Sequence, residues 1–221
     1  MAKLKWDEIG KRYYEAGTSK GVLFVLNPTT KKYDKGVAWD GLTAVKQSPD
    51  GADTNDMYAN NGKYGTLRGA ENFKGSIEAY TYPEEFAECD GSKQVIPGVY
   101  LGQQNRKQFA LVYSTKIGND TNGLDEGEKI HIIYGCTCSP SSREYETINN
   151  DPEPIKLTWE FQATAQSVTK EGFSSCAYVS IDSRKIEAQK LEKIQKKIYG
   201  GDGPTENSSL PDINELIELI K

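Results

Sequence analysis

One stretch, residues 106–140, most constrains what this chain can fold into, because it reads as two long strands joined by a polar turn. Residues 107–117 and 128–138 are rich in β-branched and aromatic side chains and contain no proline, as is typical of strands. The segment between them holds three glycines, two asparagines and two aspartates, which are residue types that turn chains. We therefore expect a long antiparallel hairpin.

Side chains alternate along both limbs of this hairpin, which predicts one buried face and one wetter face. The larger apolar residues expected inside are Phe109, Leu111, Tyr113, Ile130, Ile132 and Tyr134. Those expected on the wetter face are Gln108, Ala110, Val112, Ser114, Lys129, His131 and Gly135.

The length and net charge of the chain limit its possible domain organisation and binding partners. At 221 residues the chain can bury a sizeable core as one domain with appendages. Its formal net charge of -5 argues against tight binding to nucleic acid, which needs a basic surface. No apolar run follows Met1 and no stretch approaches the ~20 apolar residues of a membrane span. We expect synthesis in a cytoplasm, where the four cysteines stay reduced.

The first half of the chain reads as short strands separated by turns. An irregular arm is expected over 1–20, strands over 21–26, 37–45, 63–67 and 73–82, a short helix over 83–88, and extended chain over 94–102. The 37–45 strand is expected to bend at Gly41. Residues 47–62 contain almost nothing to bury, which predicts a long loop.

The second half ends in helices. After the hairpin we expect a strand at 143–148, a turn at 149–154, an amphipathic strand at 155–165 and a strand at 174–181. Asp182 or Ser183 can cap a helix that runs to residue 199, where Gly200 stops it. A flexible linker over 200–209 precedes a last helix with an apolar stripe. The chain is thus expected to be all-β with minor helices.

A metal or catalytic site has few candidates. His131 is the single histidine, and no G-x-S-x-G nucleophile motif accompanies it. Cys136, Cys138, Cys176 and Cys89 could be combined with it for zinc. The Cys-x-Cys spacing is wrong for a zinc knuckle, and His131 should point to the other strand face unless a bulge intervenes. Buried thiols acting as small hydrophobes are the alternative.

Carboxylates give no better site. Glu84, Glu85 and Glu88 could mimic a catalytic carboxylate pair, but acids in the first turn of a helix are ordinary dipole partners. The chain has no phosphate-binding P-loop and no dinucleotide-binding glycine motif. We therefore assign no catalytic, cofactor-binding or metal-binding residue. A β-rich chain with long strands and mobile arms points to assembly, since strand edges can pair with neighbours.

Several stretches resemble the major tail protein, or tail tube protein, of long non-contractile-tailed (siphovirus-type) bacteriophages. They are residues 36–43, 75–91, 102–107, 117–120, 130–135 and 154–161. The most specific match is Tyr-Pro-Glu-Glu-Phe-Ala at 82–87, followed by Gly-Gln-Gln at 102–104. The resemblance spans most of residues 5–199.

The resemblance implies a β-sandwich or barrel with a flanking helix, and a structural rather than enzymatic role. Together with the residue patterns above, it gives an N-terminal arm at 1–20, a tail-tube β domain at 21–200 with its helix near 183–199, and, from the patterns alone, a linker with a C-terminal helix at 201–221. It also implies hexameric rings that stack around a tape-measure protein beside other tail proteins in the virion. DNA then passes through the lumen during ejection, and no cofactor or membrane insertion is involved.

Two other readings stay open: the tube subunit of a tailocin or secretion-type injection system, and a β-sandwich module that binds carbohydrate or a receptor. On the tail-tube reading, residues 47–62 become ordered by a neighbour, and the 210–220 helix docks on an apolar surface. The wetter hairpin face lines the lumen. Ala110→Lys should therefore be tolerated, while Leu111→Lys should prevent folding.

Overall fold

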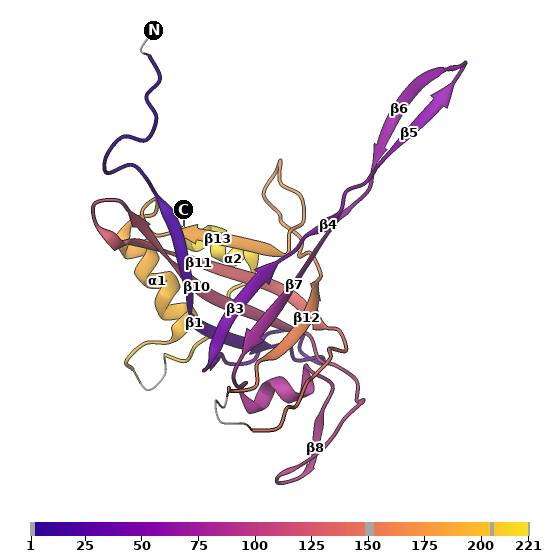
Figure 1. The fold of residues 1–221 in the computed structure, drawn as a ribbon, viewed down its shortest axis with the longest axis vertical. Coiled ribbons are helices and arrows are strands. Elements are labelled where there is room, and N and C mark those ends of the chain that lie inside the picture. The colour runs from indigo at the N-terminus through magenta and orange to yellow at the C-terminus, as the bar shows by residue number, and fades with distance from the viewer. Residues whose placement is uncertain (1–2, 149–152, 204–205, 221) are drawn as a thin grey trace.

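The computed structural model describes residues 3–148, 153–203 and 206–220. In that part of the chain, a nine-stranded antiparallel sheet curls into half a barrel (Figure 1). Its order is β2-β1-β10-β11-β12-β7-β3, with β13 beside β11 and β4 beside β7. The strands are β1 (Tyr14–Val25), β2 (Val37–Ala38), β3 (Leu42–Gln47), β4 (Asp50–Gly51), β7 (Glu71–Ala79), β10 (Phe109–Asn119), β11 (Gly123–Cys138), β12 (Leu157–Ala163) and β13 (Tyr178–Asp182).

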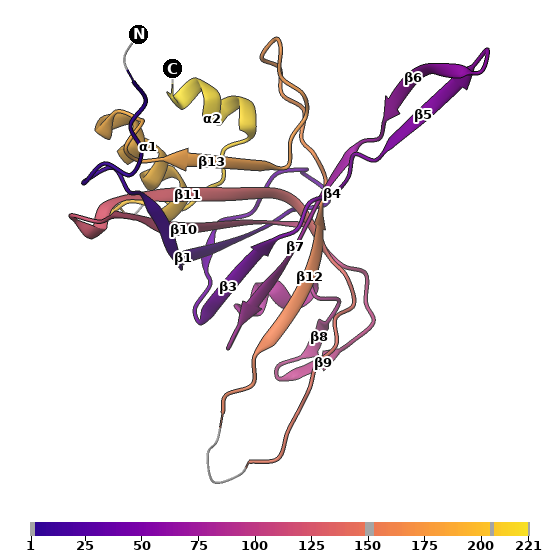
Figure 2. The same ribbon diagram turned by 45° about the horizontal axis from the view of Figure 1, so that its top comes forward.

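Within the described ranges, two hairpins and three helices surround the sheet. The hairpins are β5 (Thr54–Ala59) with β6 (Gly62–Arg68), and β8 (Lys93–Ile96) with β9 (Val99–Leu101). The helices are the 3-10 helix η1 (Glu84–Glu88), α1 (Ala188–Tyr199) and α2 (Ile213–Ile220). The β5–β6 hairpin and the N-terminal arm leave the body at one end of the long axis, and β8–β9 leaves it at the other (Figures 1 and 2). The mostly-β fold with minor helices is confirmed.

The central hairpin is confirmed, with a shorter turn than expected. β10 and β11 pair from Phe109↔Cys136 to Asn119↔Gly123. Only three residues connect the two strands, because the glycine-rich segment after the turn continues the ladder. The side chain of Asn119 fixes the turn: its Oδ1 accepts the backbone N–H groups of Thr121 (3.0 Å) and Asn122 (2.5 Å). Asparagine commonly turns a chain by bonding nearby backbone in this way.

The expected division of the hairpin faces is wrong. Tyr113 lies opposite His131 and Val112 lies opposite Ile132, and directly opposed residues share a face. Ile130, Ile132 and Tyr134 therefore lie with Ala110 and Val112, which are fully buried rather than wet. The period-two alternation predicted within each strand is right. Which side chains of the two strands share a face depends on the register between β10 and β11, and the turn sets that register. Both faces of the hairpin are covered.

One face of the sheet holds an aromatic core. Trp39, Phe86 and Trp159 meet there, with ring centroids 4.6 Å apart for Trp39–Phe86 and 5.2 Å for Phe86–Trp159. Phe109, Leu111 and most other buried members of this cluster come from β1, β7, β10, β11 and β12, while Cys89 follows η1 and Ala177 precedes β13. The amphipathic strand predicted around 155–165 is confirmed as β12, with alternate residues directed into this core.

The opposite face of β10–β11–β13 is covered by α1 and α2 (Figure 2). Ile194 and Ile198 of α1 are fully buried, as their helical spacing predicts, and Gly200 ends the helix at a φ of 86°. Ile213 and Leu216 of α2 are buried in the same core, so the last helix docks on its own subunit.

Helix α1 begins five or six residues after the caps expected from sequence. Glu187 occupies the N-cap position. Asp182 is instead paired with Arg184, at 2.8 Å between the carboxylate and the guanidinium. The Oγ of Ser183 accepts the backbone N–H of Glu128 at 2.9 Å, which ties this segment to β11. Both capping side chains therefore have tertiary partners.

Residues 47–62 are not a loop, because β4, β5 and the start of β6 lie within them. The β5–β6 hairpin turns at Asn60 and Asn61, whose φ angles are 49° and 62°. Two positive φ angles suit a tight hairpin turn, and asparagine tolerates them. The expectation relied on burial, whereas this ribbon is almost wholly exposed and is held by its own ladder.

Several boundaries differ from those expected. β1 begins at Tyr14, inside the expected arm, and two short strands, β2 and β3, flank Gly41 where one bent strand was expected. Residues 143–148 form no strand, and most of the expected 149–154 turn lies outside the described residues. The linker is attached to the body, since the N–H of Ser209 donates to the carbonyl of Lys197 (2.8 Å).

Candidate assembly surfaces

The two outer edges of the half-barrel carry unpaired backbone. β2 pairs only with Val22 and Leu23 of β1, so the N-terminal half of β1 has no second neighbour in the described chain. β3 likewise pairs only with β7 among the described residues. Unpaired N–H and C=O groups on an exposed edge are a template for pairing with another chain. Both edges are therefore candidate contacts with neighbouring copies.

A polar sheet face lies opposite the aromatic core on β3, β7 and β12. Along these strands the residues that alternate with the buried ones are Ala44, Lys46, Lys74, Ser76, Glu78, Thr158, Glu160 and Gln162. Opposed pairs include Thr158↔Glu78 and Glu160↔Ser76. Two lysines and two glutamates leave this face with no net charge. It is a half-exposed, hydrophilic surface.

The N-terminal arm is anchored to the β10–β11 turn at Gly10 and at Arg12, whose guanidinium lies 3.9 Å from the Asp120 carboxylate. The N–H of Gly10 donates to Asp120 Oδ1 (3.0 Å), and Asn119 Nδ2 donates to the carbonyl of Gly10 (3.2 Å). Before this anchor, Leu4, Trp6 and Ile9 are 72–82% exposed. Large side chains this exposed on an anchored segment are typical of a contact surface. The sequence analysis linked mobile arms to assembly but named no contact residue in this arm.

Both hairpins also expose apolar side chains. On β5–β6 they are Met57, Tyr58, Tyr64 and Leu67, and on β8–β9 they are Val95, Ile96, Val99, Tyr100 and Leu101. A two-stranded hairpin alone is marginal in water, so both hairpins are candidate contacts with a partner. The turn signal Asn60-Asn61-Gly62 could have located the first hairpin from sequence.

His131 belongs to a polar network between β1, β10, β11 and β13. Its Nε2 lies 2.8 Å from Thr115 Oγ1 and 3.1 Å from Glu15 Oε1, and its Nδ1 lies 2.7 Å from the Tyr178 hydroxyl. The ring stacks on Tyr113, 4.6 Å between centroids. A neutral Nε2–H tautomer satisfies every member, because Tyr178 donates to Nδ1 and Thr115 donates to Glu15 (2.6 Å).

The electrostatics of this network favour a structural role. Burial lowers the pKa of His131 below its ordinary value, and this outweighs the neighbouring Glu15 carboxylate, which raises it. Partial burial raises the pKa of Glu15, but the hydrogen bonds from Lys129 and Thr115 lower it further, leaving a net decrease. The network ties the edge strand β1 to the centre of the sheet. Every polar group in it has a protein partner.

The four cysteines do not come together with His131 to form a metal site. Gly135, at a φ of 62°, forms the bulge that could bring His131 onto the face of Cys136 and Cys138. His131 nevertheless bonds Glu15, Thr115 and Tyr178, as described above, while Cys136 and Cys138 lie in the aromatic core. Burial raises the pKa of Cys89 to about 12 and that of Cys136 well above its ordinary value. Cys176 belongs to the other core.

Two acidic residues of η1, Glu84 and Glu88, are bound to different partners and do not form a carboxylate pair. Glu84 accepts the Tyr100 hydroxyl at 2.8 Å, and Glu88 is paired with Lys107. Within the described residues, no cluster of three or more histidine, cysteine or acidic side chains could hold a metal ion. The same residues contain no helix of sufficient length and apolarity to cross a membrane.

Comparison with known proteins gives a family. A family model described as "Phage tail tube protein" matches residues 27–199, whereas no curated protein matches the chain. One similar solved structure is a chain of an extracellular contractile injection system, from its sheath–tube complex in the extended state. The two share 11% identity over 81% of this chain and 94% of that chain, with a TM-score of 0.38.

A second similar structure is the tube-terminating cap of the anti-feeding prophage. It has 11% identity, covers 83% of this chain and 97% of that chain, and gives a TM-score of 0.34. The family match itself covers more than half of the chain and includes the central hairpin, η1 and β12. This chain belongs to the phage tail tube protein family.

Proposed function

We propose that six copies of this chain form a ring, and that rings stack into the tail tube through which DNA is ejected into the host. The observation that carries the proposal is the half-barrel with two open edges, β1 and β3. An open edge on each side lets the sheet of one copy continue towards the next. Repetition of one such heterologous contact closes a ring when the rotation fits.

The polar face of β3, β7 and β12 is proposed to line the lumen, in place of the β10–β11 hairpin expected from sequence. Neither face of that hairpin is free, because the aromatic core covers one and the helices α1 and α2 cover the other. The β3–β7–β12 face is hydrophilic and balanced in charge. A wall without a strong positive field would not hold a polyanion that must slide past it.

The exposed β5–β6 hairpin is proposed to contact a neighbouring copy, which would supply the burial it lacks within the subunit. Residues 21–200 are proposed as the unit that forms the ring. The proposed partners are further copies, a tape-measure protein inside the tube and other tail proteins. On this proposal the chain is made in the host cytoplasm and works in the virion without an enzymatic activity or cofactor.

A charge change on the proposed lumen face tests this function. Thr158 lies opposite Glu78, so Thr158→Lys should fold normally and form normal tubes. It adds one positive charge per subunit to the wall, and particles carrying it should eject DNA slowly or incompletely. Gln189→Lys at an exposed position of α1 makes the same charge change away from the proposed lumen and is the matched control. Normal ejection from tubes that carry Thr158→Lys would contradict the assignment of this face.

A further inference from the structure

Ahead of its anchor, the tip of the N-terminal arm combines apolar and basic side chains. Residues 3–9 carry Lys3 and Lys5 before Trp6 and Asp7 and Glu8 after it, so the segment is neutral overall and its basic part is the tip. Lys5 and Lys11 lie beside Glu8, at 3.9 Å and 2.5 Å. Trp6 is 74% exposed. The hydrogen bonds of Gly10 to Asp120 and Asn119 tether the arm to the β10–β11 turn.

A groove at the opposite end of the subunit has the complementary character. It lies between η1, the β8–β9 hairpin and residues 34–37, with a volume of about 440 Å³. Val37, Ala87 and Tyr100 give it an apolar part. Its charged lining comprises Asp34, Glu84, Glu85 and Glu88 against Lys35 and Lys107, a net charge of -2.

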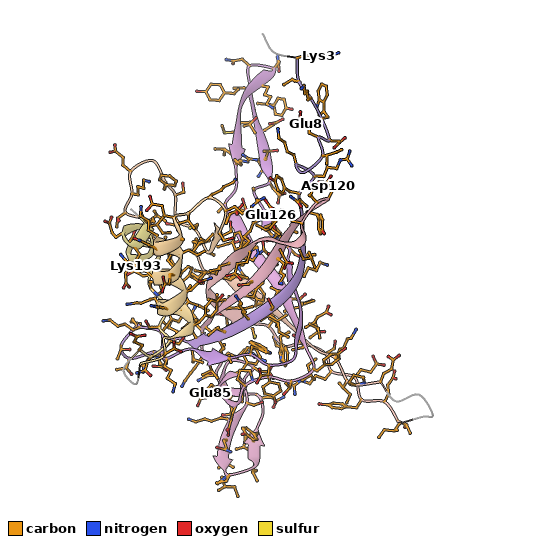
Figure 3. All side chains as sticks on the ribbon, turned by 90° about the vertical axis from the view of Figure 1, so that its left-hand side faces the viewer. Lys3, Glu8, Glu85, Asp120, Glu126 and Lys193 are labelled. Atoms are coloured by element: carbon orange, nitrogen blue, oxygen red, sulfur yellow. The ribbon has the colours of Figure 1, made fainter. Side chains whose placement is uncertain are left out.

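The placement of arm and groove suits copies stacked head to tail. Figure 3 shows Lys3 and Glu8 at one end of the molecule, with Asp120 at the base of the arm, and Glu85 at the other end beside β8–β9. A copy translated along this axis brings its groove towards the arm of the copy before it. Contacts that repeat by translation are heterologous and build an open stack.

We propose that residues 3–9 of one copy dock in the β8–β9 groove of a second copy in the adjacent ring. Trp6 enters the groove beside Tyr100, and the lysines of the arm lie against Glu84 and Glu85. Within the described residues Glu85 has no cationic partner, so it is free to take one from another copy. This inference rests on the proposed function, because it names the contact that joins stacked rings.

Three full-length variants test the contact by electron microscopy and by the critical concentration for tube growth. Trp6→Ala should raise that concentration about tenfold or more, as buried aromatic anchors do at interfaces. Lys3→Glu should weaken stacking, and adding Glu85→Lys to it should restore growth. Lys193→Glu, which makes the same charge change on α1 between the two ends (Figure 3), should grow as wild type.

A disulfide cross-link supplies a direct readout. In a Cys176→Ser background, Leu4→Cys combined with Gln94→Cys leaves Trp6 in place and should give a ladder of covalent oligomers in oxidised tubes, because Leu4 is 72% exposed and Gln94 lines the groove. The three remaining cysteines are buried and cannot compete.

The outcomes separate the two proposals. Tubes that grow normally with Trp6→Ala, or that show no cross-link, would overturn the docking while leaving the tube function standing. Wild-type protein that forms another closed symmetry and no rings would overturn both. Loss of stacking with Trp6→Ala, rescue by the reversed charge pair and a covalent ladder would together support the docked arm.

Discussion

Ala110→Lys is the substitution on which the structure and the sequence pattern disagree most sharply. Alternation along the hairpin places Ala110 on a wet face, where lysine would be harmless. The structure places it on β10 opposite Phe24, fully buried in the core that α1 and α2 cover. The two views therefore predict opposite results for one purified protein.

The expected cost follows from that environment. Extra side-chain volume in a packed core costs about 1–3 kcal/mol. An ammonium group left without a buried partner adds several kcal/mol more. Typical domains are stable by only about 5–15 kcal/mol, so Ala110→Lys should be unfolded or should lose at least ~4 kcal/mol in urea unfolding followed by circular dichroism.

A control variant separates this effect from added charge alone. Thr158→Lys places the same group on the polar face of β12, opposite Glu78, and should change the free energy of unfolding by less than about 0.5 kcal/mol. Ala110→Lys protein with a wild-type urea midpoint would show that the covered face of β10 is in fact accessible, which would refute the two-core description.

Three further predictions concern single side chains. Leu216→Ala should lower the free energy of unfolding by about 2–5 kcal/mol in urea, since this α2 side chain is 1% exposed; an unchanged midpoint would show that α2 does not dock. Burial holds the pKa of folded His131 below 6.5, so the unfolded chain binds the proton first. Stability should therefore decline below about pH 6.5, and His131→Gln should lack this decline. A thiol reagent should react in the native state with Cys176 alone, and with three more cysteines after denaturation.

Local sequence patterns predicted the elements that depend on residues close to one another in the chain. The central hairpin, β12 and the buried stripe of α1 all follow from periodicity, and Gly200 ends its helix as its position suggested. These features depend on neighbours two to four residues away. Sequence reasoning could therefore identify them without any knowledge of the tertiary fold.

Structural features that depend on residues far apart in the sequence could not be predicted from local patterns. The register between β10 and β11 decides which face holds Ile132, and it depends on the geometry of a three-residue turn. Ser183 bonds β11 instead of capping α1, which a local capping pattern cannot reveal. The β5–β6 ribbon has no buried stripe, so a method based on burial reads it as a loop.

The candidate surfaces, too, could be predicted from the sequence only in part. The family resemblance led to the tail-tube fold and the expectation of assembly, whereas the alternation along the hairpin assigned a wet face to Ala110 and Val112, which are buried. A polar face becomes visible only when β3, β7 and β12, which are far apart in the chain, lie side by side. The N-terminal arm offered a weak signal in Leu4 and Trp6, whose exposure is evident only in three dimensions.

Cryo-electron microscopy of tubes assembled from the full-length chain would show both the ring symmetry and the strands that form the lumen wall. We expect stacked six-membered rings in which Lys74, Ser76 and Glu160 face the lumen and the β10–β11 hairpin lies beneath α1 and α2. Rings of another symmetry, or a lumen wall built from β10 and β11, would contradict this expectation.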